Sequence, residues 1–314
     1  MAGRWGDWEL SRPVLGLAGL MGVLLLLPLV GAFLAGGVGA ALGLGMGYLA
    51  SSRPAATMRW RLTLALSLGA AMAGAVAVAL RGQPLAATFF VALCCLLAAP
   101  ANQIQEGLMA GVPTVAAVLV AVPGTYEVGP TFAWMLAGSV VVVAVATRFL
   151  PRAASGAPVD TERGWRHAGV MAVTVGVVVF LVLRFDVPHG YWIALTLTVV
   201  LRPFGDVTRR KALERVAGTI AGVALSLVLA TVLPIWGVAI AVAFCMVLMA
   251  AYALKGDYVR QVVFLTPTVV LMGSWGTVGL VGLERALATV AGAVLAALVG
   301  GSLALYDARA EDRA

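Results

Sequence analysis

Charged side chains are scarce in this chain. Of its 314 residues only 11% are Asp, Glu, Lys or Arg, whereas 62% are apolar. Soluble domains usually carry about 25% charged residues, because a surface in water has to be polar. The deficit excludes a soluble globular fold, and the apolar excess excludes a disordered chain. The mean hydropathy of +1.02 therefore predicts a protein that is solvated by lipid.

Histidine and cysteine are scarce as well. Two histidines are too few for a multi-histidine metal site, and Cys94, Cys95 and Cys245 lie in apolar runs without the spacing of a metal or redox motif. We expect these thiols to be small buried side chains. The sequence contains neither H-E-x-x-H nor G-x-x-x-x-G-K-[ST]. We therefore expect no enzyme, no cofactor and no resident metal.

Long apolar segments fill the rest of the sequence. A helix that crosses a membrane needs about 20 mostly apolar residues, and the runs lack the alternation of a membrane β-barrel. We predict an all-α polytopic membrane protein with about 12 transmembrane helices. Only Gly36 and Gly37 separate the first two segments, so that boundary is the weakest. The expected spans are 13–33, 36–51, 61–80, 85–100, 107–123, 131–149, 167–184, 190–203, 212–233, 236–254, 260–277 and 283–305.

Basic residues predict the orientation of the spans. If the N-terminus is cytoplasmic, the opposite side holds only Arg81, Arg184 and Arg285, which leaves 18 of the 21 Lys and Arg inside. Cytoplasmic loops of membrane proteins carry such an excess. We expect both termini in the cytoplasm. The net charge of +7 then reflects topology and contact with membrane lipid, and nucleic acid is not expected as a partner.

A polar interruption divides the chain into two halves. Residues 151–166 are expected to be a cytoplasmic linker between a six-helix half over 1–150 and a second six-helix half over 167–314. The halves resemble each other weakly, because Arg53-Pro54 corresponds to Arg202-Pro203. Pro113-Thr114-Val115 likewise corresponds to Pro267-Thr268-Val269. An even number of spans in each half predicts a pseudo-two-fold axis along the membrane normal.

A second repeat lies within the C-terminal half. The pattern E-R-x3-T-x-A-G begins at Glu214 and again at Glu284. Three predicted spans separate the copies, so they run in opposite directions, as in an inverted-topology repeat. The N-terminal half does not keep the pattern, since Thr131 and Gly138 stand where the C-terminal half has Arg285 and Gly292.

The repeated residue types suit an anion pathway. Arg, Thr and Gly at i, i+4 and i+7 share one helical face. An arginine inside a membrane normally faces a partner or a water-filled cavity, and we place it near a helix N-terminus, which also attracts anions. The hydroxyl adds a donor, and glycine lets a ligand or another helix approach. The candidate residues are Arg215, Thr219, Gly222, Arg285, Thr289 and Gly292.

Other interpretations stay open at this point. The two arginines can instead snorkel to the lipid headgroups while Thr and Gly pack helices. We expect Glu214 and Glu284 to cap helices or be solvated, and Trp192, with Trp236 and Trp275, to belong to an interfacial aromatic belt. Thr266 and Pro267 shape either a cavity or a kink. His189 is a candidate for proton coupling together with Asp186, although a solvated loop histidine is the commoner case.

These residues resemble a known family. The segments His189-Gly-Tyr-Trp-Ile-Ala-Leu-Thr-Leu-Thr-Val-Val-Leu-Arg-Pro203, Arg209-Arg-Lys211 and Glu214-Arg215-Val-Ala-Gly-Thr-Ile-Ala-Gly222 are similar to the signature of the fusaric acid resistance (FUSC) and aromatic acid exporter family. Phe264-Leu-Thr-Pro267 and the Arg285, Thr289, Gly292 series resemble its later motifs. The resemblance covers about 165–305, and the N-terminal half matches only in hydropathy.

The resemblance implies a multi-pass protein of the bacterial inner membrane that exports organic, especially aromatic, carboxylates. Proton or membrane potential would drive export, because the chain has no nucleotide site. The large cytoplasmic domain common among family exporters is missing from this sequence, which leaves substrate and accessory partners open. A passive organic-anion channel and a membrane scaffold without a solute remain as alternatives. A homo-oligomer also stays open.

Overall fold

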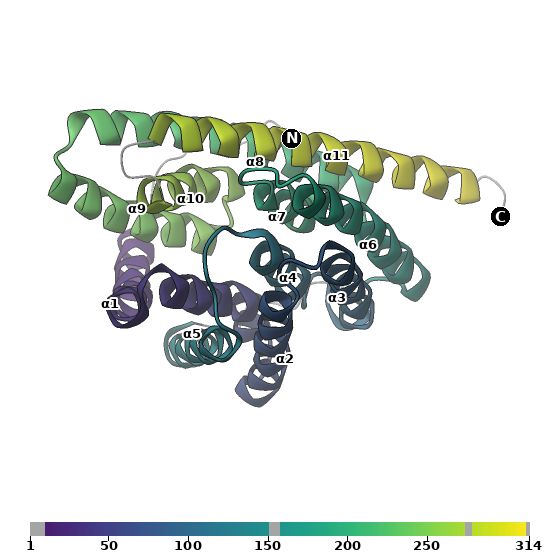
Figure 1. Cartoon of the computed structure of the whole chain (residues 1–314), viewed down its shortest axis with the longest axis horizontal. Coiled ribbons are helices and arrows are strands. Elements are labelled where there is room, and N and C mark those ends of the chain that lie inside the picture. Colours follow the sequence, from purple (N-terminus) through teal and green to yellow (C-terminus); the bar gives the residue numbers. More distant parts are fainter. Residues whose placement is uncertain (1–9, 151–157, 274–277, 312–314) are drawn as a thin grey trace. The chain divides into compact units, whose positions relative to one another are not determined.

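The computed structural model describes residues 10–150, 158–273 and 278–311, and within these ranges it is built from eleven helices (Figure 1). In chain order they are α1 (Arg12–Thr57), α2 (Trp60–Ala79), α3 (Pro84–Ile104), α4 (Gly111–Ala121), α5 (Val128–Phe149), α6 (Thr161–Arg184), α7 (Tyr191–Val200), α8 (Gly205–Val232), α9 (Ile235–Lys255), α10 (Tyr258–Gly273) and α11 (Val278–Glu311). The described part of the chain contains no strand. The all-α prediction is confirmed.

Eight of the described helices are long and apolar enough to cross a membrane. The other three, α4, α7 and α10, are shorter apolar helices. Every predicted segment overlaps a helix within the described residues, and residues 274–277 of the eleventh segment lie outside them. The expectation of twelve spanning helices is not confirmed. The protein is a multi-pass α-helical membrane protein in which three short helices are interspersed among the long ones.

The weakest predicted boundary is a break inside α1. Gly36 and Gly37 leave helical geometry there, with φ/ψ of −146°/18° and 67°/−157°. The Gly37 conformation is one that side chains with a Cβ rarely adopt, which explains why glycine stands at this position. The helix resumes after Gly37 and continues to Thr57, beyond the predicted end at residue 51.

The predicted linker is partly helical. Residues 151–157 lie outside the described residues, but α6 already begins at Thr161. The carboxylate of Asp160 accepts hydrogen bonds from the backbone N–H groups of Glu162 and Arg163, so Asp160 caps the helix. The polar residues that precede the apolar segment therefore already belong to the helix. The division into an N-terminal and a C-terminal half stays a prediction.

The chain forms two compact units, which are described separately. Unit 1 comprises Met1–Leu26 and Ala217–Leu283, and unit 2 comprises Leu27–Val216 and Glu284–Ala314. In unit 1, α9 and α10 pack side by side, and Tyr252 stacks on Phe264 with ring centroids 5.6 Å apart. Unit 2 contains most of the buried apolar core and all of the candidate site described first below.

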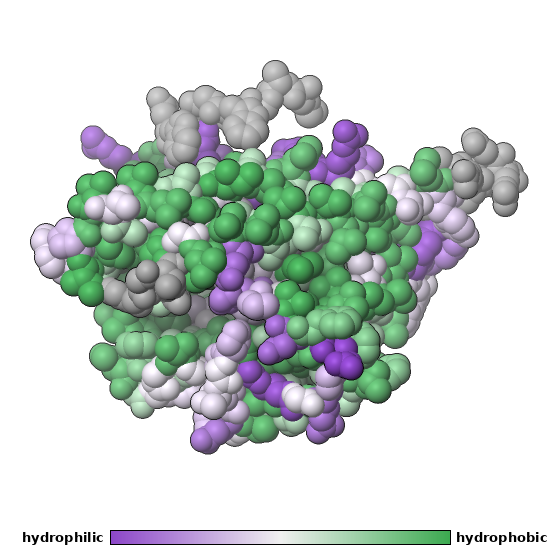
Figure 2. Space-filling model, turned by 45° about the horizontal axis from the view of Figure 1, so that its top comes forward, coloured by the Kyte–Doolittle hydropathy of each residue, from purple (hydrophilic) through white to green (hydrophobic). Residues whose placement is uncertain are grey.

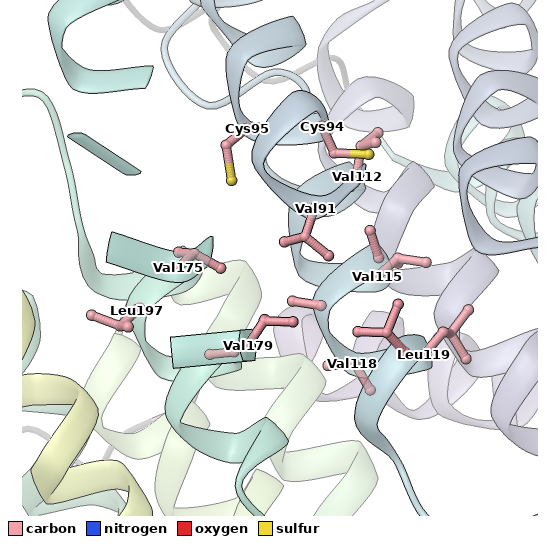
Figure 3. Packing of buried hydrophobic residues seen from close by; sticks show 14 of the residues in the cluster. Val91, Cys94, Cys95, Val112, Val115, Val118, Leu119, Val175, Val179 and Leu197 are labelled. Carbon is pink, nitrogen blue, oxygen red and sulfur yellow. The ribbon is translucent and has the colours of Figure 1, made fainter. Parts of the chain in front are cut away.

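The core of unit 2 lies among α3, α4, α6 and α7. The most extensive helix pair in it is α3 with α6, and α4 packs on α7. Figure 3 shows how Val91 and Cys95 of α3, Val115 and Leu119 of α4, and Val175 of α6 meet. All three cysteines of the chain are free and buried, as expected for small apolar side chains. Small and branched side chains let these helices approach closely.

Large apolar side chains cover much of the surface. Leu34, Phe89 and Val232 are each more than 70% exposed. Figure 2 shows apolar residues over much of the face it presents. Surface patches of this extent in a soluble monomer would mark a binding face, whereas contact with lipid accounts for them over the whole of a membrane protein.

Candidate anion-binding site

The two repeated arginines lie inside long helices and not at helix N-termini. Arg215 is ten residues beyond the start of α8 at Gly205, and Arg285 is seven residues beyond the start of α11 at Val278. The prediction that a helix N-terminus adds to the anion site is therefore wrong. The reason is that residues before the predicted spans already belong to both helices, a polar stretch over 205–211 in α8 and the apolar residues 278–282 in α11.

Arg285 is a buried cation in unit 2. The residue is 4% exposed, and its Nε is a buried atom without a hydrogen-bond partner. Its guanidinium lies over the ring of Trp192, 5.1 Å from the centroid. Arg215, also 4% exposed, is close enough to repel Arg285 electrostatically. A buried charge without a counter-charge is costly, so an anion is expected beside Arg285.

Burial argues against the alternative in which the arginines snorkel. A snorkelling side chain reaches the headgroup region and remains solvated there. Both arginines are instead enclosed by protein. Arg285 meets the face of an aromatic ring, which attracts a cation but does not neutralise it. The guanidinium therefore keeps its capacity to bind a carboxylate through two parallel hydrogen bonds.

Trp192 is part of the site and not of an exposed aromatic belt. It is only 5% exposed, whereas Trp236, predicted for the same belt, is 68% exposed. Trp275 lies outside the described residues. The Trp192 ring stacks on His189 with centroids 5.0 Å apart, and Tyr191 packs against it at 5.3 Å. The belt interpretation of Trp192 is wrong because Gly190 and the turn before it place this ring under Arg285 and not at the surface.

His189 pairs with Glu284. The His189 Nδ1 is 2.7 Å from the Glu284 Oε2, across 95 positions in the sequence. Glu284 is therefore neither a helix cap nor simply solvated. Glu214, its counterpart, accepts a hydrogen bond from Arg210 Nε at 2.8 Å, one turn away on α8. Asp186 is exposed with φ of 48°, and it is not brought into the pair.

The Thr and Gly of the second copy pack α11 against α7. Thr289 is 3% exposed, and a Cβ added to Gly292 would lie 2.8 Å from the Thr196 Cβ and 2.9 Å from the Ile193 carbonyl oxygen. Only glycine allows this approach. Thr196 is fully buried, and its hydroxyl has no partner within the described residues.

The first copy packs in the same way in unit 1. A Cβ at Gly222 would lie 2.5 Å from the Thr266 Cβ and 2.7 Å from the Val263 carbonyl oxygen. Pro267 has no N–H, so it leaves this carbonyl four residues earlier without its usual helical partner. Thr219 is 1% exposed, and Thr266 donates its hydroxyl to the Val262 carbonyl at 2.9 Å. Here Thr266 packs against Gly222, and Pro267 lies inside α10.

The two packing contacts are related by one sequence offset that the sequence analysis missed. Leu195-Thr-Leu-Thr-Val-Val-Leu201 corresponds to Leu265-Thr-Pro-Thr-Val-Val-Leu271, 70 residues later. Glu214 and Glu284 are also 70 residues apart, as are Thr196 and Thr266. An alignment of the sequence with itself at this offset would have identified α7 and α10 as packing partners. They pack against α11 and α8, the helices that carry the E-R-x3-T-x-A-G pattern.

Two short helices, α4 and α7, lie in the core of unit 2. The α4 and α7 helices pack together, and the Thr114 hydroxyl donates to the Thr198 hydroxyl at 2.9 Å. Ten residues of helix extend about 15 Å, roughly half of the 30 Å apolar layer of a membrane. The segments at both ends of α7, with Tyr191 and Arg202, are therefore inset from the membrane surfaces if α6 spans it.

The end of α4 is capped by a basic residue. Arg81 donates hydrogen bonds to the carbonyl oxygens of Leu119 and Val122, and its guanidinium lies 4.7 Å from the centre of the Tyr126 ring. Burial raises the pKa of the Tyr126 hydroxyl, and the nearby Arg81 opposes this in part. A short helix inside the apolar layer needs such partners because lipid offers none.

The N-terminal half keeps the close approach but not the charge. A Cβ on Gly138 of α5 would collide with the carbonyl oxygen of Leu44 in α1. Thr131, in the position that corresponds to Arg285, is buried and 4% exposed. Within the described residues, no group of three His, Cys, Asp or Glu side chains is arranged to hold a metal ion.

Residues 166–299 match the model of a family described as fusaric acid resistance protein-like. This region is similar to that family. The match covers α7, α8, α9, α10 and the part of α11 that carries Arg285, so it confirms the resemblance seen in the sequence. It supports membrane transport of the efflux type. Comparison with curated proteins and with solved structures found no match.

Proposed function

We propose that this protein exports organic carboxylates across the inner membrane of a bacterium. The observation that carries the proposal is Arg285, a buried guanidinium over Trp192 with no carboxylate beside it in the described structure. The neighbouring Arg215 adds a second positive charge. A carboxylate between them would neutralise the buried charge, and the family match supports transport as the purpose of binding.

The Trp192 and Tyr191 rings favour aromatic acids as substrates. An aromatic carboxylate can place its charged group on Arg285 while its ring meets these side chains. Aromatic pairs contribute about 0.5–1.5 kcal/mol beyond the area they bury. This proposal accounts for an arginine that rests on an aromatic cluster.

Replacing Trp192 should change selectivity more than maximal rate. We expect Trp192→Leu to lower the preference for benzoate over acetate by about two- to twelvefold, the equivalent of about 0.5–1.5 kcal/mol. The measurement is competition between the two acids in a liposome flux assay. Trp236→Leu is the matched control, since Trp236 is exposed. An unchanged preference in Trp192→Leu would contradict the aromatic site.

An inverted repeat accounts for the paired contacts. We infer that α6, α7 and α8 form one three-helix group and that α9, α10 and α11 form the other. The supports are the common offset of 70 residues and the equivalent contacts of Gly292 with Thr196 and Gly222 with Thr266. Twelve membrane crossings follow if the short helices cross together with the segments that flank them. Proton coupling through the His189–Glu284 pair is part of the same proposal.

Both termini are proposed to be cytoplasmic. We expect a single cysteine at Thr125 and one at Arg209 to react with an impermeant maleimide from opposite sides, because the basic residues separate these positions. The measurement is labelling of intact cells and of inverted vesicles, in a background where Cys94, Cys95 and Cys245 are buried. Labelling of both positions from the same side would reject this topology.

Flux in liposomes tests the proposed function. Purified protein is reconstituted with a panel of aromatic and aliphatic acids under an imposed pH gradient or potential. We expect saturable uptake that depends on a gradient, whereas a channel would give unitary currents. Protein that carries no acid in any condition, yet stabilises a partner in the membrane, would overturn transport in favour of a scaffold.

A further inference from the structure

Two tyrosines of unit 2 each lie beside an arginine. Tyr126 follows α4, and the guanidinium of Arg81 lies 4.7 Å from the centre of its ring. Tyr191 begins α7, and its hydroxyl is close enough to Arg285 to interact with that charge. All four residues belong to unit 2, and the two tyrosines also interact electrostatically with each other. The two pairs are therefore neighbours, and they differ in their hydrogen bonds.

The Tyr126–Arg81 pair makes its hydrogen bonds within the protein. Tyr126 donates its hydroxyl to the Pro123 carbonyl oxygen at 2.9 Å. Arg81 donates to the carbonyl oxygens of Leu119 and Val122, at the end of α4. A tyrosine has one O–H to donate, so Tyr126 has no donor left for a ligand. This pair serves the structure of the α4 end.

The Tyr191–Arg285 pair has no such acceptors. Within the described residues, no protein group accepts a hydrogen bond from the Tyr191 hydroxyl or from the Arg285 guanidinium. Arg285 is buried, and Tyr191 is half-buried. Polar groups in the interior of a protein are nearly always hydrogen-bonded. An unpaired hydroxyl beside an unpaired cation therefore points to an acceptor that comes from outside the chain.

The turn before α7 holds Tyr191 in a fixed position. A Cβ on Gly190 would lie 2.6 Å from Val182 Cγ2, so glycine lets this turn lie against α6. The Val187 N–H donates to the Val182 carbonyl, and the Gly190 N–H donates to the Val187 carbonyl, each at 3.1 Å. The Tyr191 ring packs on Trp192 with centroids 5.3 Å apart. A hydroxyl that is already positioned favours binding, because the ligand does not have to order it.

We propose that Tyr191 is a substrate-binding residue whose hydroxyl, together with Arg285, holds the carboxylate of the transported acid. This inference rests on the proposed function for the class of ligand. The guanidinium engages the carboxylate through two parallel hydrogen bonds, and the Tyr191 hydroxyl donates a third to a remaining lone pair. The hydroxyl thus sets the affinity for any carboxylate, whereas the rings of Tyr191 and Trp192 set the preference for aromatic ones.

Binding of benzoate and acetate to the purified full chain in detergent tests this role. Tyr191→Phe removes the hydroxyl and keeps the ring. We expect the dissociation constants of both acids to rise about tenfold, because one hydrogen bond to a charged group is lost, and their ratio to stay unchanged. The measurement is equilibrium binding of radiolabelled benzoate with unlabelled acetate as the competitor. An unchanged benzoate constant would overturn the role of the hydroxyl, and so would a loss confined to benzoate, since acetate has the carboxylate but no ring.

Tyr126→Phe is the matched control for the loss of a tyrosine hydroxyl. It should bind benzoate as the wild type does, because the Tyr126 hydroxyl is engaged by Pro123. An equal loss of affinity in Tyr126→Phe and Tyr191→Phe would overturn the proposal, since both changes would then act through packing. If Tyr191→Phe does not elute as a single species, Tyr191→Met also lacks the hydroxyl and is judged by its acetate constant alone. A wild-type acetate constant in Tyr191→Met would contradict the proposal.

Binding and flux together distinguish this inference from the proposed function. If Tyr191→Phe binds both acids more weakly but the wild-type protein carries no acid in liposomes, the role of the hydroxyl stands and transport fails. If the wild-type protein transports benzoate but Tyr191→Phe binds it as the wild type does, transport stands and the role of the hydroxyl fails. A wild-type protein that binds neither acid overturns the role of the hydroxyl.

Discussion

Arg285→Gln is expected to reduce organic-acid flux by about ten- to a hundredfold. Glutamine keeps a side chain of similar reach but removes the positive charge and the forked donor. A hydrogen bond to a charged group contributes about 1.5–3 kcal/mol, and 1.4 kcal/mol corresponds to a factor of ten. The effect should be large because Arg285 is 4% exposed, so water cannot replace the lost contact. The measurement is the initial rate of benzoate uptake per reconstituted protein.

Two further variants make this result specific. Arg184→Gln removes an exposed arginine at the end of α6 and should transport as the wild type does. Arg285→Lys keeps the charge but loses bidentate geometry, so we expect it to lie between the wild type and Arg285→Gln. Wild-type flux in a folded Arg285→Gln protein would show that Arg285 only packs on Trp192.

The helices were largely predictable from sequence because lipid imposes a simple rule. Every apolar run of the required length became a helix, and the break in α1 falls on the two glycines that separated the first predicted spans. Helix starts were less predictable, as in α6 and α8, where a capping aspartate or a polar stretch extends the helix. Whether a ten-residue helix crosses the membrane depends on its neighbours, which the sequence of α7 alone does not specify.

The candidate site was predicted in part. Arg215 and Arg285 were identified because a buried charge in an apolar run is costly, and both are buried. The contacts of Glu284 with His189 and of Arg285 with Trp192 were missed, because each joins residues more than 90 positions apart. Local rules assign Glu284 to a helix end and Trp192 to an interface. Only tertiary packing reveals that Glu284 pairs with His189 and that Trp192 lies under Arg285.

The glycines of the repeat should be as sensitive to substitution as the arginines. Gly292→Leu and Gly222→Leu are each expected to prevent recovery of folded, monodisperse protein. At Gly292 the first added carbon already lies 2.8 Å from the Thr196 Cβ, and at Gly222 it lies 2.5 Å from the Thr266 Cβ. In both places a backbone carbonyl lies within 3 Å as well, so a rotamer change of the threonine does not make room. Overpacking of a close interface costs about 1–3 kcal/mol or more.

The matched control lies on the same helix as Gly292. Gly301 of α11 has no atom within 4 Å of an added Cβ, so Gly301→Leu should fold and transport normally. The measurements are the yield of a single species by size-exclusion chromatography and its thermal midpoint in detergent. Equal tolerance of leucine at Gly292 and Gly301 would mean that α11 does not approach α7 closely. Failure at Gly292 with tolerance at Gly222 would show that the two copies of the motif do not pack equivalently, and the inverted repeat would then lose its strongest support.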